Sequence, residues 1–297
     1  MIQIKYPVVC FGEVLWDIFP TGKEPGGAPV NVAYHLHMHK KEPAVITCIG
    51  NDEDGRQLKN VFKGRGINTS YFVTDEAHET GKVYGVADAS HNMRYNIVQP
   101  VAWDFIPWDA AGEGLVKEAS CFVYGSLAAR SQVSRNTLMR LLDAANKKVL
   151  DINLRPPHYN KETLAELLQR ADILKMNEEE LDIVAPWFTG FNNREDKIKT
   201  IADKLNLEIF IVTLGAKGAL LYMDGKLYQH PGYKITVADT VGSGDAFLAG
   251  LLSKWMDGSS TDAMLDYASK LGAFVATKKG ACPLYDPDTI NEFSGGG

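Results

Sequence analysis

The chain has 297 residues, of which 45% are hydrophobic and 23% charged, and its formal net charge is -6. A chain of this length can bury enough apolar surface to fold without disulfide bonds, and its four widely spaced cysteines, which form no CxxC pair, predict free thiols in a reducing compartment. No run of Lys and Arg exceeds two residues, and no apolar run reaches the roughly 18 residues of a membrane span. We therefore expect a cytoplasmic protein with no nucleic-acid or membrane partner.

The first third of the chain predicts the start of an α/β fold. The apolar runs Pro7–Gly12 and Ala44–Ile49 predict strands, and Asn31–Lys40 between them predicts a helix. The Gly- and Pro-rich segment Thr21–Pro29 predicts a loop. Between about Tyr71 and Val101 the pattern changes to short segments rich in Tyr, Val and Thr, which indicates a small β subregion that projects from the main domain.

From Cys121 onward, apolar strands alternate with helices, a pattern that indicates a parallel sheet with helices on both faces. Two long helices then close the chain. Ligands of open parallel sheets bind outside the carboxyl ends of the strands, so the residues that follow each strand are the first functional candidates. The predicted strands are Cys121–Tyr124, Val149–Ile152, Asp172–Met176 and Ile209–Leu214, and the predicted helices are Asn136–Asn146, Lys161–Arg170, Glu195–Leu205, Ala246–Met256 and Thr261–Lys278.

A glycine-rich turn runs directly into a helix within Asp239–Phe247, DTVGSGDAF. Gly242 and Gly244 give the backbone unusual freedom, and the unpaired N–H groups at the helix start suit a phosphate. Asp245 would repel that phosphate unless it has a task, and accepting the proton of an attacking hydroxyl is such a task. Taken alone, the turn is equally well explained by Ser243 or Asp245 capping the helix. It is not a P-loop, because no Lys-Ser or Lys-Thr follows the glycines.

This segment resembles the C-terminal signature of the PfkB/ribokinase family of carbohydrate kinases, usually written D-T-x-G-A-G-D, with Ser243 where Ala is commonest. The resemblance implies that Asp245 is the catalytic base. It also implies that the amides of Gly242, Ser243 and Gly244 form an anion hole, and that Asp239 helps to hold a monovalent cation such as K⁺ beside it.

Two segments near the N-terminus resemble the sugar-binding segments of the same family. GGAPVNVA at 26–33 is particularly like the fructokinase branch, and GEVLWD at 12–17 is similar to the family's GE-x-(apolar)-x-D. The resemblance implies that Asp17, Gly27 and Asn31 bind the sugar. Alone, the two segments would indicate an exposed loop Asp and a turn before an Asn-capped helix.

Further motifs follow the later strands in the family's order. DINLRP at 151–156 resembles the fructokinase D-x-N-x-R-P, which implies that Asn153 and Arg155 face the sugar or phosphate region. NEEE at 177–180 matches N-x-x-E, whose ends, Asn177 and Glu180, would help to hold Mg²⁺, largely through waters. Without that context, the acidic run would indicate the first turn of a helix.

Two more segments resemble nucleotide-binding parts of the family. VTLGAKGA at 212–219 is similar to VTLG-x-x-G, which implies that Thr213, Gly215 and Gly218 lie along the nucleotide. KGACP at 279–283 resembles the segment near the adenine and includes Ala281.

The matches run in family order along nearly the whole chain, so the protein is identified as a member of the family. The resemblance implies one ribokinase-like α/β domain over 1–297, with a central, mostly parallel sheet flanked by helices on both faces. A small β lid from approximately 14–20 and 71–101 would carry Arg94 over the ligand, and it often mediates homodimer contacts in this family. The expected activity is ATP- and Mg²⁺-dependent phosphorylation of a primary hydroxyl of a small sugar, with fructose favoured.

Several alternatives stay open at this point. Ribose, 2-keto-3-deoxygluconate, a sugar phosphate or a nucleoside are other substrates of the same family. A sensor that binds sugar or nucleotide without turnover is a different class, although it would have no need for Asp245. A dinucleotide-binding dehydrogenase lacks its early GxGxxG. His35, His37 and His39 fall close together, but with no third ligand at a known spacing they predict surface histidines rather than a metal site.

Overall fold

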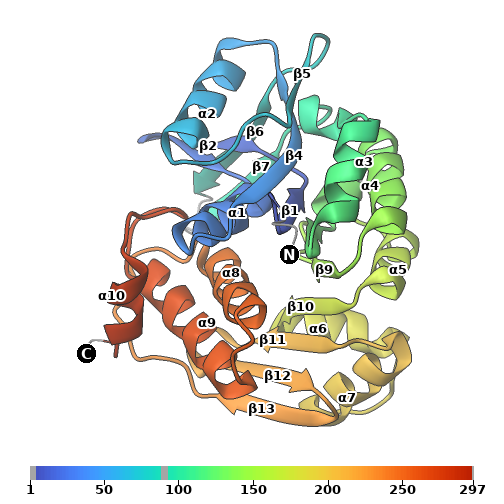
Figure 1. Cartoon of the computed structure of the whole chain (residues 1–297), viewed down its shortest axis with the longest axis vertical. Coiled ribbons are helices and arrows are strands. Elements are labelled where there is room, and N and C mark those ends of the chain that lie inside the picture. Colours follow the sequence, from blue (N-terminus) through green and yellow to red (C-terminus); the bar gives the residue numbers. More distant parts are fainter. Residues whose placement is uncertain (1–4, 88–92, 296–297) are drawn as a thin grey trace.

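Two β-sheets organise the computed structural model, which describes residues 5–87 and 93–295 (Figure 1). The larger sheet is parallel from β11 to β5, and β12 and β13 add an antiparallel edge. Its strands lie in the order β13 (Lys226–His230), β12 (Ala219–Met223), β11 (Ile209–Thr213), β10 (Ile173–Asn177), β9 (Lys148–Asp151), β8 (Cys121–Gly125), β1 (Val8–Phe11), β4 (Pro43–Gly50) and β5 (Phe72–Asp75).

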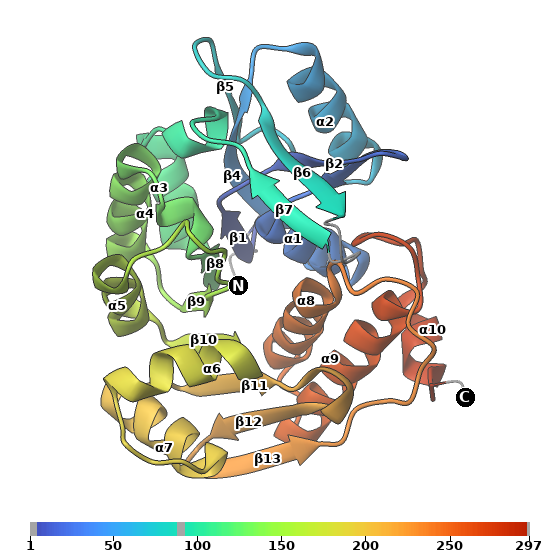
Figure 2. The same cartoon turned by 180° about the vertical axis from the view of Figure 1, so that it is seen from behind.

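Helices cover both faces of this sheet, as Figure 1 and the reverse view in Figure 2 show. Successive side chains of a strand point to opposite faces of the sheet, so Leu174 packs in one core cluster and Ile173 in the other. The prediction of a mostly parallel sheet between two helical layers is confirmed. One core cluster involves α1 (Ala28–Met38), α2 (Glu53–Gly64), α8 (Ser243–Met256) and α9 (Thr261–Ala276), and the other involves α3 (Ala110–Glu118), α4 (Gln132–Ala144), α5 (Lys161–Arg170), α6 (Glu178–Val184) and α7 (Arg194–Leu205).

The short helix α10 (Pro287–Glu292) contributes Ile290 to a third, smaller core cluster beside α9. In the part of the chain that the structure describes, no helix is both long and apolar enough to cross a membrane.

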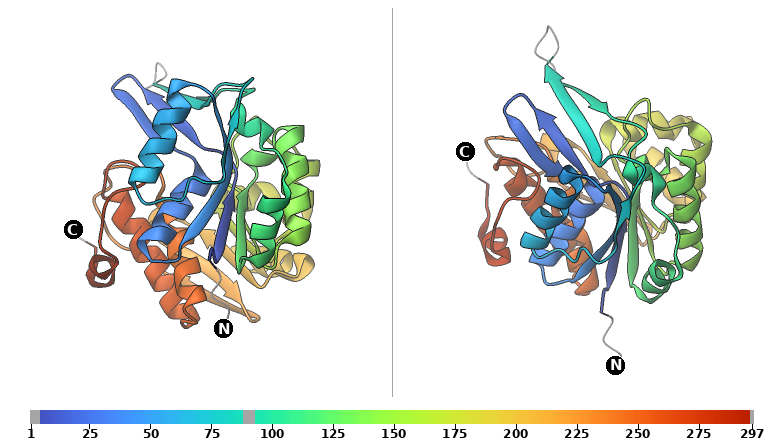
Figure 3. Two further views of the ribbon diagram at one scale, coloured as in Figure 1. Left: turned by 45° about the horizontal axis from the view of Figure 1, so that its top comes forward. Right: turned by 90° about the horizontal axis from the view of Figure 1, so that it is seen from above.

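The smaller sheet holds β3 (Gly22–Gly26), β2 (Leu15–Phe19), β6 (Gly81–Ala87) and β7 (Met93–Ile97) in that order, and its last two strands stand out from the body in Figure 3. The predicted loop over Thr21–Pro29 is wrong in its first part, because β3 pairs with β2 through the tight turn after Phe19. Pro25 is compatible with β3 because this is an edge strand, where an amide donor can be missing. Within the expected lid range 71–101, β5 joins the large sheet instead.

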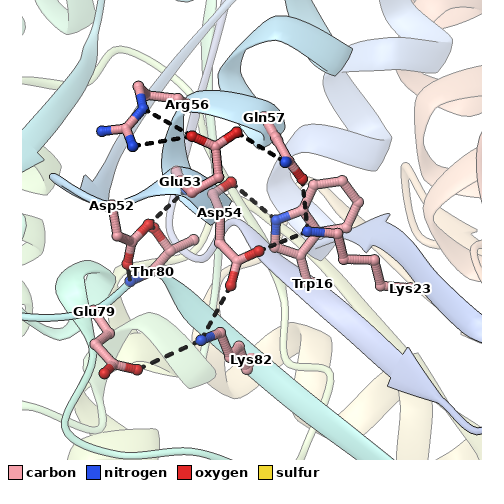
Figure 4. A network of polar contacts seen from close by, with 11 residues as sticks. Trp16, Lys23, Asp52, Glu53, Asp54, Arg56, Gln57, Glu79, Thr80 and Lys82 are labelled. Carbon is pink, nitrogen blue, oxygen red and sulfur yellow. Dashed lines mark hydrogen bonds and ion pairs between the residues drawn. The ribbon is translucent and has the colours of Figure 1, made fainter.

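A polar network joins the small sheet to α2 (Figure 4). Asp54 near the start of α2 accepts contacts from Lys23 of β3 at 2.6 Å and from Lys82 of β6 at 3.1 Å, and its carbonyl accepts the indole N–H of Trp16 at 3.0 Å. Partly exposed ion pairs of this kind contribute little stability each, but together they fix where the small sheet meets α2.

A buried ion pair lies at the stem where the chain leaves the small sheet. Arg130 donates from Nε and Nη2 to the two carboxylate oxygens of Asp104, both at 2.7 Å, and from Nη2 to the carbonyl of Val98 at 2.7 Å. Its guanidinium lies 3.8 Å from the ring centroid of Trp103. The stem of the small sheet is therefore held to the body by a largely satisfied polar cluster.

Candidate active site

The candidate site lies where the N-termini of α1 and α8 meet the carboxyl ends of the large sheet's strands. Asn31 in the first turn of α1 donates from Nδ2 to Oδ2 of Asp245 in the first turn of α8, at 2.8 Å. The two residues are 214 positions apart in the sequence. The fold thus brings Asn31, the predicted sugar-binding residue, into direct contact with Asp245, the predicted base.

The glycine-rich turn has the backbone shape that the sequence predicted. Gly242 occupies the N-cap of α8 with φ 76°, a left-handed conformation that favours glycine. A Cβ there would lie 2.4 Å from the Cβ of Ala281, so the turn also needs glycine in order to pack against that residue. Ser243 donates its hydroxyl to the carbonyl of Gly272 at 2.9 Å. The N-cap has no side chain that could cap the helix, and the amide of Ser243 donates to the carbonyl of Thr240 at 3.2 Å. Among the described residues of this turn, the amides of Gly242 and Gly244 therefore remain for an anion.

The carboxylate of Asp245 is tuned by its surroundings. Desolvation raises its pKa to about 6, while the hydrogen bond from Asn31 and the nearby Lys175 and Arg155 oppose the rise and Asp151 adds to it. A carboxylate with a pKa near 6 is ionised at neutral pH and is still a better base than an ordinary Asp. The electrostatics therefore suit proton abstraction.

The predicted sugar ligands cluster around the start of α1. Gly27 is the N-cap of α1 with φ 123°, and a Cβ there would lie 2.4 Å from the carbonyl oxygen of Glu13. Asp17 of β2 lies against Gly26, and burial raises its pKa to about 6 against the opposing charge of Arg155. Glu13 accepts the amide of Ala28 at 3.3 Å, and desolvation raises its pKa to about 7.

The segment after β9 supplies the next two candidates. Asn153 has φ 40°, a left-handed conformation that Asn tolerates better than most residues. Arg155 is exposed and donates to the carbonyl of Leu154 at 3.1 Å. Its charge acts on the pKa of Asp17, Glu13 and Asp245, which places it within the same electrostatic field. Arg94 belongs to β7, but its side chain lies outside what the structure describes.

The predicted nucleotide residues follow β11 and the last long helix. Thr213 ends β11 and donates to the carbonyl of Met176 at 3.4 Å. Gly215 and Gly218 both have left-handed backbone, with φ 58° and 89°, and a Cβ on Gly218 would lie 1.9 Å from the carbonyl of His230. Ala281 is the buried neighbour of Gly242, so the predicted adenine segment touches the predicted anion hole.

The predicted metal residues are tied to backbone rather than gathered in a cage. Glu180 accepts the amides of Leu154 and Asn177, each at 2.8 Å, and Asn177 caps α6 in return. Asp239 accepts the amides of Val241 and Gly280, each at 3.0 Å. Among residues 5–87 and 93–295, no three His, Cys, Asp or Glu side chains converge on a point that could hold a metal ion. An ion here would depend on phosphate and water for its ligands, which fits the expected water-mediated role of Glu180.

Comparison with known proteins decides the family. Residues 4–287 match the model of the "pfkB family carbohydrate kinase". The chain belongs to this family of sugar kinases, and the prediction from its motifs is confirmed.

Relatives of this kinase include "Fructokinase-1" of Oryza sativa subsp. japonica, which is 29% identical over 93% of this chain and 93% of its own length. A fructokinase structure from Vibrio cholerae O395, with fructose, ADP and potassium bound, matches with TM-score 0.83 at 24% identity over 99% of this chain and 100% of that one. The aminoimidazole riboside kinase of Salmonella enterica, with its riboside and an ATP analogue bound, matches with TM-score 0.77 at 26% identity over 96% and 99% of the two chains.

Sequence reasoning missed two charged residues of this kinase at the site, Asp151 and Lys175. Lys175 lies on β10 and donates to Asp151 on β9 at 2.6 Å, and both side chains are buried beneath α8. The available signal was a charged residue within an otherwise apolar run, Asp151 at the end of β9 and Lys175 in the middle of β10. Such a residue is costly unless it is paired or functional.

The expectation of surface histidines is wrong for His35. Its side chain is fully buried in the kinase and contacts the carbonyl of Ala281 and the hydroxyl of Tyr285, each at 2.9 Å. Desolvation lowers its pKa to about 3, so it stays neutral. Cys282 also contacts Asn31, at 3.4 Å. These contacts join α1, which carries the predicted sugar ligand, to the predicted adenine segment.

Proposed function

We propose that this kinase transfers the γ-phosphoryl group of ATP to a primary hydroxyl of fructose. The observation that carries this proposal is the contact between Asn31 and Asp245 at the N-terminus of α8, which supports a role for Asp245 as a base next to an anion site. The segments GGAPVNVA and DINLRP favour fructose over other sugars, as do GSLA at 125–128, which resembles a fructokinase segment, and the similarity to plant fructokinases.

The reaction needs one proton acceptor and one anion site. Asp245 accepts the proton of the sugar hydroxyl while that oxygen forms a bond to the γ-phosphorus. The bond from phosphorus to the bridging oxygen breaks, and ADP leaves with that electron pair. The amides of Gly242, Ser243 and Gly244 stabilise the negative charge on the transferring group. The sugar is held by Asp17, Gly27, Asn31, Asn153, Arg155 and Arg94, and the nucleotide by Asn177, Thr213, Gly215, Gly218 and Ala281.

Two cations belong to this proposal. Asn177 and Glu180 would hold Mg²⁺ through waters, and the ion would supply positive charge that offsets the charge of the phosphates. A monovalent cation such as K⁺ would lie beside Asp239, whose carboxylate bonds both the segment before α8 and the turn at Gly280.

The small sheet is proposed as a lid and as a dimer contact. Closure over the sugar would exclude water, which otherwise competes for the phosphoryl group. Among the described strands β7 ends the small sheet, and Tyr84 and Tyr95 are 41% and 52% exposed, which supports pairing with a second copy. Sedimentation measured against protein concentration tests the homodimer. The four free thiols, three of them buried, support a cytoplasmic location.

ADP release from Mg-ATP with a panel of sugars tests the proposed function. Fructose is the expected substrate, with ribose and 2-keto-3-deoxygluconate as comparison. A nucleoside belongs in the panel because the 26% identical Salmonella relative is a riboside kinase. Turnover on another member alone would correct the substrate. Binding of ATP and sugar without any turnover would favour the sensor reading.

A further inference from the structure

A buried lysine lies beneath the catalytic turn. Lys175 and Asp151 are directly opposite each other on the paired strands β10 and β9, so their side chains point to the same face of the sheet. Both residues are 6% exposed, and the ammonium of Lys175 lies 2.6 Å from Oδ2 of Asp151. Among the described residues, this is the one hydrogen bond of either side chain.

The alternation of the strands places the pair under α8. Val149 and Ile173, two residues earlier on the same strands, pack in one core cluster with Leu248 and Leu251 of α8. A Cβ built on Gly244 would lie 3.4 Å from Nζ of Lys175. The ammonium therefore lies in van der Waals range of residue 244, which immediately precedes Asp245.

Charged and titratable groups face Asp245 from every element around it. Lys175 is the buried cation of the set and is screened less by solvent than the exposed Arg155. The neutral Asn31 faces Asp245 from α1. The charged or titratable groups are Asp151 from β9, Lys175 from β10, Arg155 from the loop after β9, Glu13 from the end of β1 and Cys282 from the C-terminal segment.

We propose that Lys175 is a positioning residue whose buried charge, moderated by Asp151, keeps Asp245 ionised and competent as a base. The inference rests on the proposed function in one respect, the role of Asp245 as the base. Asp151 is needed because a buried ammonium without a partner is costly. The pair thus places part of a positive charge beneath the carboxylate.

A purely structural pair would make a different prediction. It would join the neighbouring strands β9 and β10, and its loss would lower stability without moving the titration of Asp245. An electrostatic role requires the two partners to act in opposite directions. Loss of the negative charge at 151 favours ionised Asp245, and loss of the positive charge at 175 disfavours it.

The test compares Asp151→Asn/Lys175→Arg with Asp151→Asn/Lys175→Met, two variants that differ in the cation alone, because Arg stays charged when buried without a partner. The carboxyl of Asp245 is followed by ¹³C NMR of aspartate-labelled protein and assigned by its loss in Asp245→Asn. We expect the midpoint to fall below that of the wild type in the Arg variant and to lie about one pH unit higher in the Met variant. The acid limb of the turnover profile should follow the same order.

Equal midpoints in the two variants would overturn the proposal. The NMR titration needs no substrate, so it decides the role of Lys175 even if no sugar is turned over and the proposed function fails. If the Arg variant does not fold, Asp151→Asn replaces it, and ¹⁵N NMR of the Lys175 side chain follows the charge of that residue. The matched control is Asp104→Asn/Arg130→Met, which removes a buried pair outside the groups that face Asp245 and should leave its midpoint unchanged.

Discussion

The kinase buries two ion pairs, Asp104–Arg130 and Asp151–Lys175, which are similarly buried but differ in the number of hydrogen bonds that they make. At the stem of the small sheet, the side chains of Asp104 and Arg130 are each 3% exposed, and the carboxylate also accepts the amide of Val101 at 3.0 Å. Beneath α8, the side chains of Asp151 and Lys175 are 9% and 7% exposed and share a single hydrogen bond.

The difference indicates two uses of buried charge. In the stem pair, Arg130 bonds both carboxylate oxygens of Asp104, each partner also bonds a backbone group, and the guanidinium stacks on Trp103. The two charges therefore neutralise each other locally, and the pair stabilises the fold. The pair under α8 has fewer partners and a third charged group, Asp245, nearby. Part of its field is therefore available to the active site.

The largest expected effect tests whether Asp245, on which the charge of the Asp151–Lys175 pair is proposed to act, is the catalytic base. Asp245→Asn should lower turnover by about two to four orders of magnitude, the usual contribution of a general base. The fold should remain intact, as measured by circular dichroism and nucleotide binding. Turnover close to that of the wild type would exclude Asp245 as the base. It would also remove the functional role assigned to the Asp151–Lys175 pair.

The stem pair should show its importance in stability. Arg130→Met leaves Asp104 buried without its partner and should lower the free energy of unfolding by about 3 to 5 kcal/mol. Guanidinium unfolding measures this loss. The control is Lys23→Met, which removes a partly exposed partner of Asp54 and should cost less than about 1 kcal/mol. Similar losses in both variants would contradict the assignment of a structural role to Arg130.

In the candidate active site, removal of a charge should raise stability rather than lower it. The pKa of Asp245 is raised from 3.8 to about 6, so this group adds stability below about pH 4 and loses that contribution as the pH rises through 6. Asp245→Asn should therefore be more stable than the wild type at pH 8, by on the order of 1 to 2 kcal/mol after discounting for partial exposure. The gain should vanish near pH 4. Thermal unfolding at both values measures it, and a gain that persists at pH 4 would point to a cause other than charge.

The smallest expected effect concerns a neutral contact in the same turn. Ser243→Ala removes the hydrogen bond to the carbonyl of Gly272 and should cost about 1 kcal/mol of stability. Turnover should change less than tenfold, because the amide of residue 243 stays in place. A loss of activity as large as that of Asp245→Asn would mean that the hydroxyl takes part in the chemistry.

The alternation of strands and helices, and the assignment of Asn31 and Asp245 to one site, could be predicted from the sequence, whereas the direct contact between the two residues was not predicted. Glycines and polar residues that follow buried strands mark the edge where a parallel sheet binds its ligands. This pattern is local, so it can be recognised in the sequence alone. The strand β3 was missed because its Gly and Pro content is typical of a loop, whereas its position at a sheet edge makes that content acceptable.

Other features depend on partners that no local pattern shows. The burial of His35 is explained by Ala281 and Tyr285, about 250 residues away, and spacing on its own helix gives no sign of them. The pairing of Asp151 with Lys175 depends on the register of β9 and β10, which the sequence does not state. The two charged residues within apolar strands were a visible anomaly, but their role could be assigned only from their three-dimensional neighbours.

The contact between Asn31 and Asp245 also has a consequence for the timing of activity during synthesis. Because 214 positions separate the two residues, a ribosome that has made the first helix must complete most of the sheet before the base reaches its partner. Partly made chains would therefore present a folded-looking N-terminal half with no ability to use ATP. Catalytic competence would arrive late and in one step, when α8 docks on α1.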